Sequence, residues 1–249
     1  MIDASSRIRD LDLSIFDHIL TETSNEDRRA LLGVQRAVML KYGQFAYLEI
    51  GSHLGGSIQP YLLNPTCTHI YSIDSRPLLQ PDDRSKGYFA HYPDNSTLRM
   101  LAYLRSLDPD AVDKIKCFET EASHLKVTDI GIRPMIAFID GEHTRNAVNL
   151  DFDFCMKVIV SSGVIIFHDF RIIYKAIFNA LHKLRRKNCV GYLIDGDVFG
   201  IFLNPKLAFE DEYLHARYKE NRHYHRWFAA KRVVSSRSLK NSTRLANFR

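Results

Sequence analysis

The segment from Phe45 to Ser57 runs from an apolar stretch through an acid into a glycine-rich turn. Six residues with high strand preference, Phe45 to Ile50, predict a buried parallel strand. Glycine has no Cβ, so a turn built on Gly51, Gly55 and Gly56 can bring its backbone close to a ligand. This pattern predicts a cofactor-binding turn, with an ordinary tight turn as the alternative.

A second apolar stretch, from His69 to Ile73, ends in Asp74. A carboxylate at the carboxyl end of this strand can accept hydrogen bonds from both hydroxyls of a ribose. The glycine spacing differs from the G-x-G-x-x-G of pyrophosphate sites, and Glu49 would repel a pyrophosphate. S-adenosylmethionine carries an ammonium, a carboxylate and a ribose but no phosphate, so it is the predicted cofactor.

Two further strands are predicted to end in acids. The first runs from Met135 and ends in Asp140, with His143 shortly after it, and the second begins at Val164 and ends in His168 and Asp169. Because the carboxyl ends of parallel strands meet at one edge of a sheet, we expect these side chains to gather there with Asp74.

These segments resemble the class I S-adenosylmethionine-dependent methyltransferases. The resemblance covers residues 36 to 204 and is to a subgroup with I-D-G-x-H after the fourth strand and G-x-I-I-F-H-D at the fifth. That subgroup includes sugar and other small-molecule O-methyltransferases, some of them metal-dependent. The chain departs from it at Ser161 to Gly163, where Pro-Gly-Gly is common.

The resemblance implies an α/β fold: a Rossmann-like, seven-stranded sheet, mostly parallel with an antiparallel last strand, and helices on both faces. A hairpin signal at residues 195 to 197 agrees with that last strand. We expect a helical leader over residues 1 to 42, a cofactor-binding core over 43 to 204 and a C-terminal extension over 205 to 249. Residues 75 to 114 read as a crossover whose proline-rich first half is a candidate substrate loop.

The candidate cofactor residues combine the glycine turn with the strand ends. Ser57 is expected to cap the helix after the turn, and the family places groups that touch adenine near Ser123. The full set is Glu49, Gly51, Ser52, Gly55, Gly56, Ser57, Asp74, Ser123 and Asp140.

Methyl transfer to an alcohol needs a base or a metal that lowers the pKa of the hydroxyl. His143 is the candidate base, because imidazole titrates near neutral pH, and Asp169 is the second catalytic candidate. Asp140, His168 and Asp169 are the candidate ligands of Mg²⁺ or another divalent cation. In the metal-free alternative, Asp169 orients His143, and Asp140 either caps the sheet edge or touches the cofactor.

The predicted function is therefore methylation of a sugar or polyol-like hydroxyl on a small molecule. Two other classes remain open: a nicotinamide-dependent oxidoreductase, and a catalytically silent binding module with the same fold. The glycine spacing disfavours the first, and the presence of both His143 and Asp169 argues against the second.

Bulk composition fits a single domain. The chain has 249 residues, 45% of them hydrophobic, and four scattered cysteines that predict reduced thiols. No apolar run reaches the roughly 18 to 20 residues that cross a bilayer, and the first ten residues lack the order of a secretory signal. We expect a cytoplasmic protein without membrane attachment.

The net charge of +5 is concentrated at the C-terminus, where residues 231 to 249 contain six cations and no acid. Few apolar residues accompany these charges, so a solvated tail is predicted rather than a nucleic-acid-binding arm. The aromatic stretch from Tyr213 to Phe228 is a candidate for docking on the core or on a second subunit of a homo-oligomer.

Overall fold

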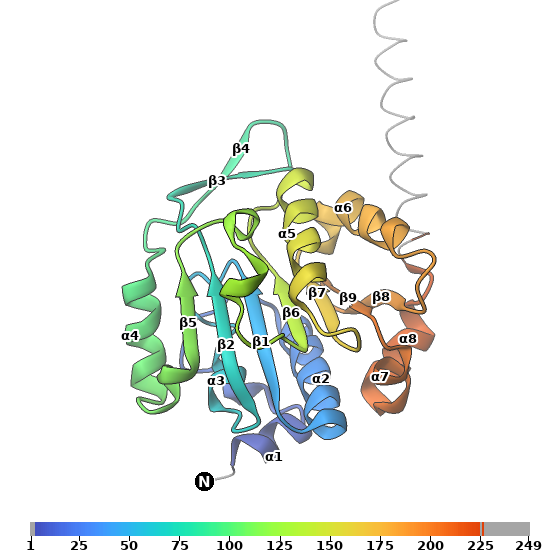
Figure 1. Ribbon diagram of the computed structural model, residues 1–249, viewed down its shortest axis with the longest axis horizontal. Coiled ribbons are helices and arrows are strands. Elements are labelled where there is room, and N and C mark those ends of the chain that lie inside the picture. Colours follow the sequence, from blue (N-terminus) through green and yellow to red (C-terminus); the bar gives the residue numbers. More distant parts are fainter. Residues whose placement is uncertain (1–2, 225, 227–249) are drawn as a thin grey trace, which may run out of the picture.

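A computed structural model describes residues 3–224 and 226, so the basic tail lies outside the described residues. The described chain is built around one seven-stranded sheet, with a separate two-stranded ribbon beside it (Figure 1). In sheet order the strands are β5 (Ile115–Phe118), β2 (Cys67–Ile73), β1 (Phe45–Ile50), β6 (Ile136–Ile139), β7 (Val164–Phe167), β9 (Val198–Phe202) and β8 (Val190–Asp195).

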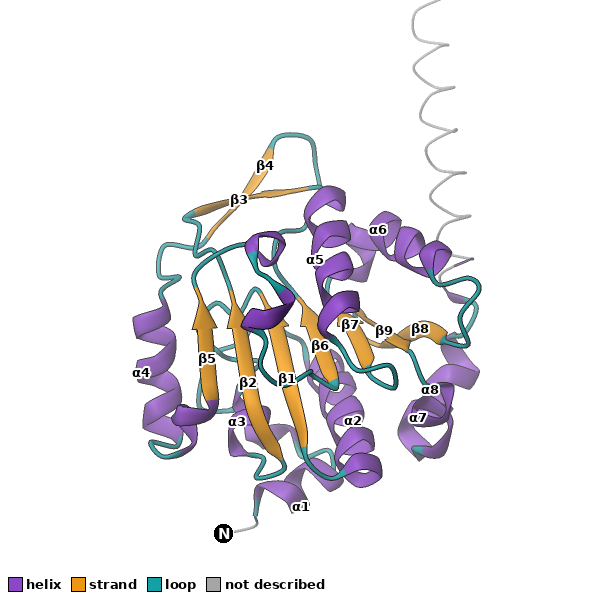
Figure 2. Cartoon of the chain, in the orientation of Figure 1, coloured by secondary structure: helices purple, strands orange, loops and turns teal. Residues whose placement is uncertain are grey.

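The strand directions confirm the predicted fold class. Strands β5, β2, β1, β6 and β7 pair in parallel, and β9 runs antiparallel to both β7 and β8. The carboxyl ends of the five parallel strands therefore lie along one edge, which is the upper edge in Figure 2. All four residues of β6 and of β7 are buried, as expected for strands covered on both faces.

Helices cover both faces of the sheet. Apolar residues of α2 (Asn25–Tyr42), α3 (Gln59–Leu63) and α4 (Thr97–Leu107) form one core cluster with the sheet. The other face is covered by α5 (Arg145–Val158) and α6 (Phe170–Lys183). The remaining helices are α1 (Ala4–Arg9), α7 (Pro205–Glu210), α8 (Glu212–Asn221) and the short 3-10 turns Leu13–Phe16, Ala111–Lys114, Ala122–His124 and Val127–Asp129.

The leader begins its long helix where the sequence indicates. The Ser24 side chain accepts a hydrogen bond from the Asp27 backbone, and the Asp27 side chain accepts one from the Ser24 backbone, so the two form a capping box. Helix α2 ends at Gly43, whose φ of 71° suits glycine. Within the described residues, no helix is long and apolar enough to span a bilayer.

The turn after β1 differs from the prediction in one respect. Helix α3 starts after Ile58, which makes no side-chain cap, so Ser57 does not cap it. The Ser57 hydroxyl instead donates a hydrogen bond to the Glu49 carboxylate. Glu49 is fully buried, so few other donors can reach its carboxyl group and the hydrogen bond from Ser57 is valuable there.

Gly51 is required where β1 meets β6. Its φ is 87°, and a Cβ at this position would lie 2.2 Å from the Asp140 carbonyl oxygen. The first glycine of the turn therefore permits close contact between two strand ends. It also fixes the position of Asp140, since the Asp140 N–H donates to the Ile50 carbonyl oxygen beside it.

We expect Gly51→Ala to lower the free energy of unfolding by about 2 to 5 kcal/mol, from left-handed strain plus overpacking. Gly87→Ala is the matched control, because Gly87 has a φ of 75° and nothing within 4 Å of its Cβ position. That control should lose only about 1 to 2 kcal/mol. Denaturant unfolding measures both, and equal losses would contradict the steric account.

The predicted crossover at residues 75 to 114 contains a β-hairpin that the sequence analysis missed. Its strands are β3 (Leu79–Asp82) and β4 (Tyr88–His91), paired antiparallel. Figure 1 shows this ribbon beyond the carboxyl ends of the main strands. Pro81 is tolerated there because a two-stranded ribbon leaves one edge of each strand unpaired.

Candidate active site

A cavity of about 260 Å³ opens at the carboxyl edge of the sheet. The turn after β1 supplies part of its wall, and the ends of β2, β6 and β7 supply another part through Asp74, Asp140 and Asp169. Three leader residues (Leu20, Thr21 and Glu22) and four residues of the hairpin region (Gln80, Arg84, Tyr92 and Asn95) complete it. The predicted convergence of acids therefore forms a concave site.

A second cavity of about 250 Å³ adjoins the first. The two share Gly51, Asp74, Gln80 and Gly141 as lining residues. The second cavity also contains Ser123, whose hydroxyl donates to Glu121 at 3.3 Å. An elongated ligand can thus extend from the acids of the first cavity, past Asp74, to Ser123.

Asp74 is held firmly at the junction of these cavities. Its carboxylate accepts hydrogen bonds from the backbone N–H groups of His53, at 3.0 Å, and Arg76, at 2.8 Å. The Arg76 guanidinium lies 3.3 Å from the same carboxylate and is itself 9% exposed. These contacts orient Asp74 in advance of any ligand.

Glu49 lies beneath the turn and does not line either cavity. Its carboxylate accepts hydrogen bonds from the Tyr47 hydroxyl at 2.7 Å and from Ser57. Complete burial raises the pKa of Glu49 to about 8, so the group is largely protonated at neutral pH. The structure therefore places Glu49 behind Ser57, which does line the first cavity.

The remaining predicted turn residues form two groups: some line a cavity, and the others contact neighbouring segments of the protein. Ser52 and Gly56 line the first cavity, while Gly55 lines neither. A Cβ on Gly55 would contact Leu104 and Met100 of α4, and one on Gly56 would lie 2.5 Å from the Leu20 carbonyl oxygen of the leader. These two glycines therefore allow protein segments to pack on the turn.

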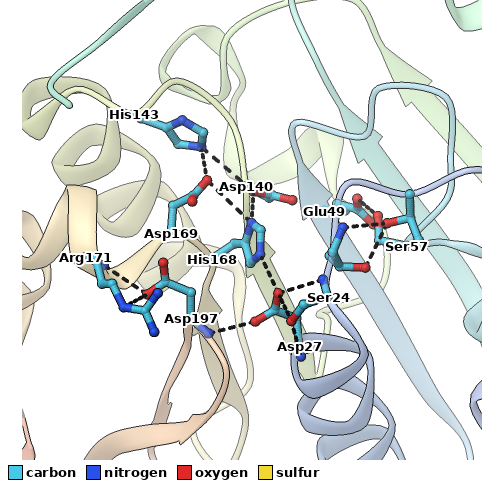
Figure 3. Close-up of polar contacts among 12 residues, drawn as sticks. Ser24, Asp27, Glu49, Ser57, Asp140, His143, His168, Asp169, Arg171 and Asp197 are labelled. Atoms are coloured by element: carbon cyan, nitrogen blue, oxygen red, sulfur yellow. Dashed lines mark hydrogen bonds and ion pairs between the residues drawn. The ribbon is translucent and has the colours of Figure 1, made fainter. Parts of the chain in front are cut away.

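His168 sits between carboxylates from two parts of the chain (Figure 3). Its Nδ1 lies 2.9 Å from Asp140 Oδ1 and 3.5 Å from Asp169 Oδ2, and its Nε2 lies 3.4 Å from Asp27 Oδ2. Asp27 also accepts the Asp197 backbone N–H at 2.7 Å. The start of α2 is thereby tied to the active-site edge and to the β8–β9 turn.

His143 bridges the hairpin and the strand ends. Its Nδ1 lies 3.0 Å from Asp82 Oδ2, and its Nε2 lies 3.0 Å from Asp169 Oδ2 and 3.9 Å from Asp140 Oδ1. Among the described residues, Nε2 makes no hydrogen bond of good geometry, although the residue is only 7% exposed. A buried nitrogen thus faces two carboxylates without a proper partner.

These contacts shift the pKa values of His143 and Asp169. Burial alone would lower the pKa of His143, but contacts with Asp140 and Asp169 outweigh burial and raise it to about 10. Burial would raise the pKa of Asp169, yet its contacts with His143 and His168 hold it well below its usual range. These contacts favour the charged imidazolium form of His143, which faces a carboxylate pair.

The donor set fits a divalent cation. Within the part of the chain that the structure describes, Asp140, His143 and Asp169 offer ligand atoms that all lie within 4.8 Å of one another. Two carboxylates and an imidazole nitrogen that lacks an aligned partner suit a hard or borderline metal ion. The predicted ligand His168 contacts the same two carboxylates, on the side of Asp27.

Two buried acids of this network were missed by the sequence analysis. Asp27 was recognisable as part of a helix start, but not as a neighbour of His168. Asp82 gave no signal, because it stands among prolines and charged residues of a segment without strand periodicity. Both contacts join residues that are far apart in the chain, which single-sequence patterns do not report.

Residues 48–170 match a family model described as a methyltransferase domain. The solved structure of the O-methyltransferase NovP superposes with a TM-score of 0.59 at 16% identity, covering 80% of this chain and 98% of that chain. CalS11, a calicheamicin methyltransferase, gives 0.52 at 12% identity and covers 80% and 91%.

Cofactor-bound Rv0187 from MTB gives a TM-score of 0.51 at 11% identity and covers 81% of this chain and 90% of that chain. A comparison with curated protein sequences gives no significant match. The sheet order and these similar structures show the fold of the class I S-adenosylmethionine-dependent methyltransferases. The family match identifies a methyltransferase domain over residues 48–170 of this chain.

Proposed function

We propose that this enzyme transfers a methyl group from S-adenosylmethionine to a hydroxyl of a small, sugar-like or polyol-like molecule. The observation that carries the proposal is the position of His143, whose Nε2 faces Asp140 and Asp169 in a cavity that also contains the glycine turn. Methyl transfer requires the acceptor oxygen to be held in line with the methyl group and to lose its proton.

We expect one cofactor molecule to extend through both adjoining cavities. In this proposal Asp74, which lines both cavities, accepts the ribose hydroxyls, and Ser123 in the second cavity lies at the adenine end. The methionine portion would then lie against Gly51, Ser52 and Gly56, toward the acids. Glu49 would act indirectly, by holding Ser57.

The outer wall of the first cavity supports a polar acceptor. Glu22, Gln80, Arg84 and Asn95 offer charged and amide groups, and Tyr92 and Leu20 add limited apolar surface. Hydroxyl-rich molecules need such donors and acceptors when they leave water. The titles of the similar structures NovP and CalS11 name an O-methyltransferase and a calicheamicin methyltransferase, which agrees with a small-molecule acceptor.

Asp140 and Asp169 are the residues that would hold a divalent cation, with an imidazole nitrogen of His143 or His168 beside them. When bound, the metal would lower the pKa of a coordinated acceptor hydroxyl. In the metal-free alternative, His143 alone removes the proton and Asp169 orients it through the 3.0 Å contact.

The raised pKa of His143 affects its role as a base both with and without a metal ion. An imidazolium cannot accept a proton, so His143 becomes a base only when its charge is no longer favoured by Asp140 and Asp169. A divalent cation between those carboxylates would repel the imidazolium and so lower its pKa. Cation binding and formation of the base would therefore support each other in this site.

Asp74→Asn should weaken binding of S-adenosylmethionine by about 1.5 to 3 kcal/mol, the scale of hydrogen bonds to a charged group. Asparagine is preferable to alanine, because its side-chain oxygen can still accept a hydrogen bond from the neighbouring Arg76 guanidinium. Titration calorimetry measures the affinity, with Asp94→Asn, an exposed acid paired to Arg99, as the control. Tight NADH binding without S-adenosylmethionine binding would instead favour an oxidoreductase.

Three further expectations belong to this proposal: a cytoplasmic location, independence from nucleic acid and membranes, and assembly as a homo-oligomer. The domain boundaries at residues 42 and 204 also stay predictions. Apolar residues on both sides of these boundaries share one core cluster with the sheet, which supports folding as a single unit.

A further inference from the structure

Asp82 is the one buried acid that the hairpin contributes to the site. Its side chain is 1% exposed, and its Oδ2 lies 3.0 Å from Nδ1 of His143. Nothing in the parallel sheet places it there, because it belongs to the separate ribbon of β3 and β4. Because buried polar groups are normally hydrogen-bonded, the contacts of Asp82 should indicate its role.

The contacts of Asp82 hold it in one orientation. Its Oδ1 accepts the Arg84 backbone N–H at 2.7 Å, and its Oδ2 lies 2.9 Å from the Arg84 guanidinium. The hairpin is also attached to the loop of His143 by backbone contacts. The Asp83 N–H donates to the His143 carbonyl oxygen at 3.2 Å, and the Asp83 carboxylate accepts the Arg145 N–H at 2.9 Å.

A carboxylate held this way can only accept a hydrogen bond, so the His143 nitrogen that faces it must carry hydrogen. The other nitrogen, Nε2, then points to Asp140 and Asp169 and is the atom available for chemistry. An acid that fixes the tautomer and orientation of a functional histidine is a known requirement in hydrolases and around metal-bound histidines.

We propose that Asp82 is a positioning residue, which fixes hydrogen on Nδ1 of His143 and directs Nε2 to the strand-end carboxylates. The proposal rests on the function assigned above to His143. It makes the hairpin part of the active site, because the same segment that lines the acceptor side through Gln80 and Arg84 also orients the base.

The test is Asp82→Ala against Asp83→Ala, two neighbouring acids of which only the first contacts the imidazole. Proton and nitrogen NMR of the His143 ring is recorded with and without S-adenosylhomocysteine and Mg²⁺. Wild type and Asp83→Ala should show an Nδ1–H proton that is protected from water exchange in both states. Asp82→Ala should lose this protection and populate the Nε2–H form when loaded.

Calorimetry with S-adenosylhomocysteine and the melting temperature show whether the variants keep their fold. Asp82→Leu, which fills the position with an apolar side chain that accepts no hydrogen bond, replaces the alanine variant if that one unfolds. An unchanged, protected Nδ1–H in both Asp82 variants would overturn the proposal. If the Nδ1–H of the ligand-free protein is protected in wild type and loses protection in the Asp82 variants, but wild type binds no S-adenosylhomocysteine, the positioning role stands and the proposed function fails.

Discussion

Replacing His143 by alanine is expected to lower methyl-transfer turnover by about 10²- to 10⁴-fold, the usual contribution of a general base. The cofactor affinity should change little, because the residues proposed to bind S-adenosylmethionine belong to other strands and to the glycine turn. The effect follows from the position of His143, which lines the cavity and whose Nε2 faces both candidate metal ligands.

Turnover is measured by formation of S-adenosylhomocysteine with a hydroxylated acceptor that the wild type methylates. His91→Ala is the matched control, since His91 is an exposed histidine on β4 outside both cavities. A selective loss in the His143 variant supports the base assignment. Normal turnover by His143→Ala would leave the metal as the only means of activating the hydroxyl.

Much of the fold was predictable because its buried strands carry strong local signals. Strand β1, the acid-ended strands β2, β6 and β7, and the final hairpin around Gly196 all formed as expected. A parallel strand that is buried on both faces must be apolar throughout, and such a stretch followed by an acid is distinctive in a sequence. The topology then placed the acids at one edge.

The parts that could not be predicted depend on long-range contacts. Ser57 was expected to cap α3, but its hydroxyl instead donates a hydrogen bond to the buried Glu49 side chain. The four residues of the hairpin strand β3 include Pro81, and the buried one is the acid Asp82, so the strand has neither apolar alternation nor typical strand residues. The contacts of Asp82 and Asp27 with the two histidines arise only when segments far apart in sequence meet.

The network also fixes the position of the leader beside the first cavity. Asp27 links the start of α2 to the Asp197 N–H and approaches His168, and a Cβ on Gly196 would lie 2.3 Å from the Asp27 carboxylate. The leader residues just before α2 line the cavity. The wall formed by Leu20, Thr21 and Glu22 is therefore positioned by the same acid that borders His168.

Removal of divalent cations with a chelator is expected to abolish turnover while leaving affinity for S-adenosylmethionine nearly intact. The two carboxylates of Asp140 and Asp169 would hold the cation, whereas the proposed cofactor contacts are with Asp74 and the glycine turn. Adding Mg²⁺ or Mn²⁺ back should restore turnover, and the more effective ion reports on the ligands, since an imidazole ligand favours Mn²⁺.

Asp169→Asn should reproduce the effect of the chelator, with a loss of at least about 100-fold, the upper range for weakened metal sites. Asparagine is the appropriate substitution, because Asp169 has a φ of 52° and asparagine tolerates this left-handed conformation better than alanine. Asp197→Asn is the control, as Asp197 pairs with Arg171 outside the ligand group. If chelation has no effect and only His143→Ala is impaired, the metal-free mechanism holds; full activity in both experiments would reject this active site.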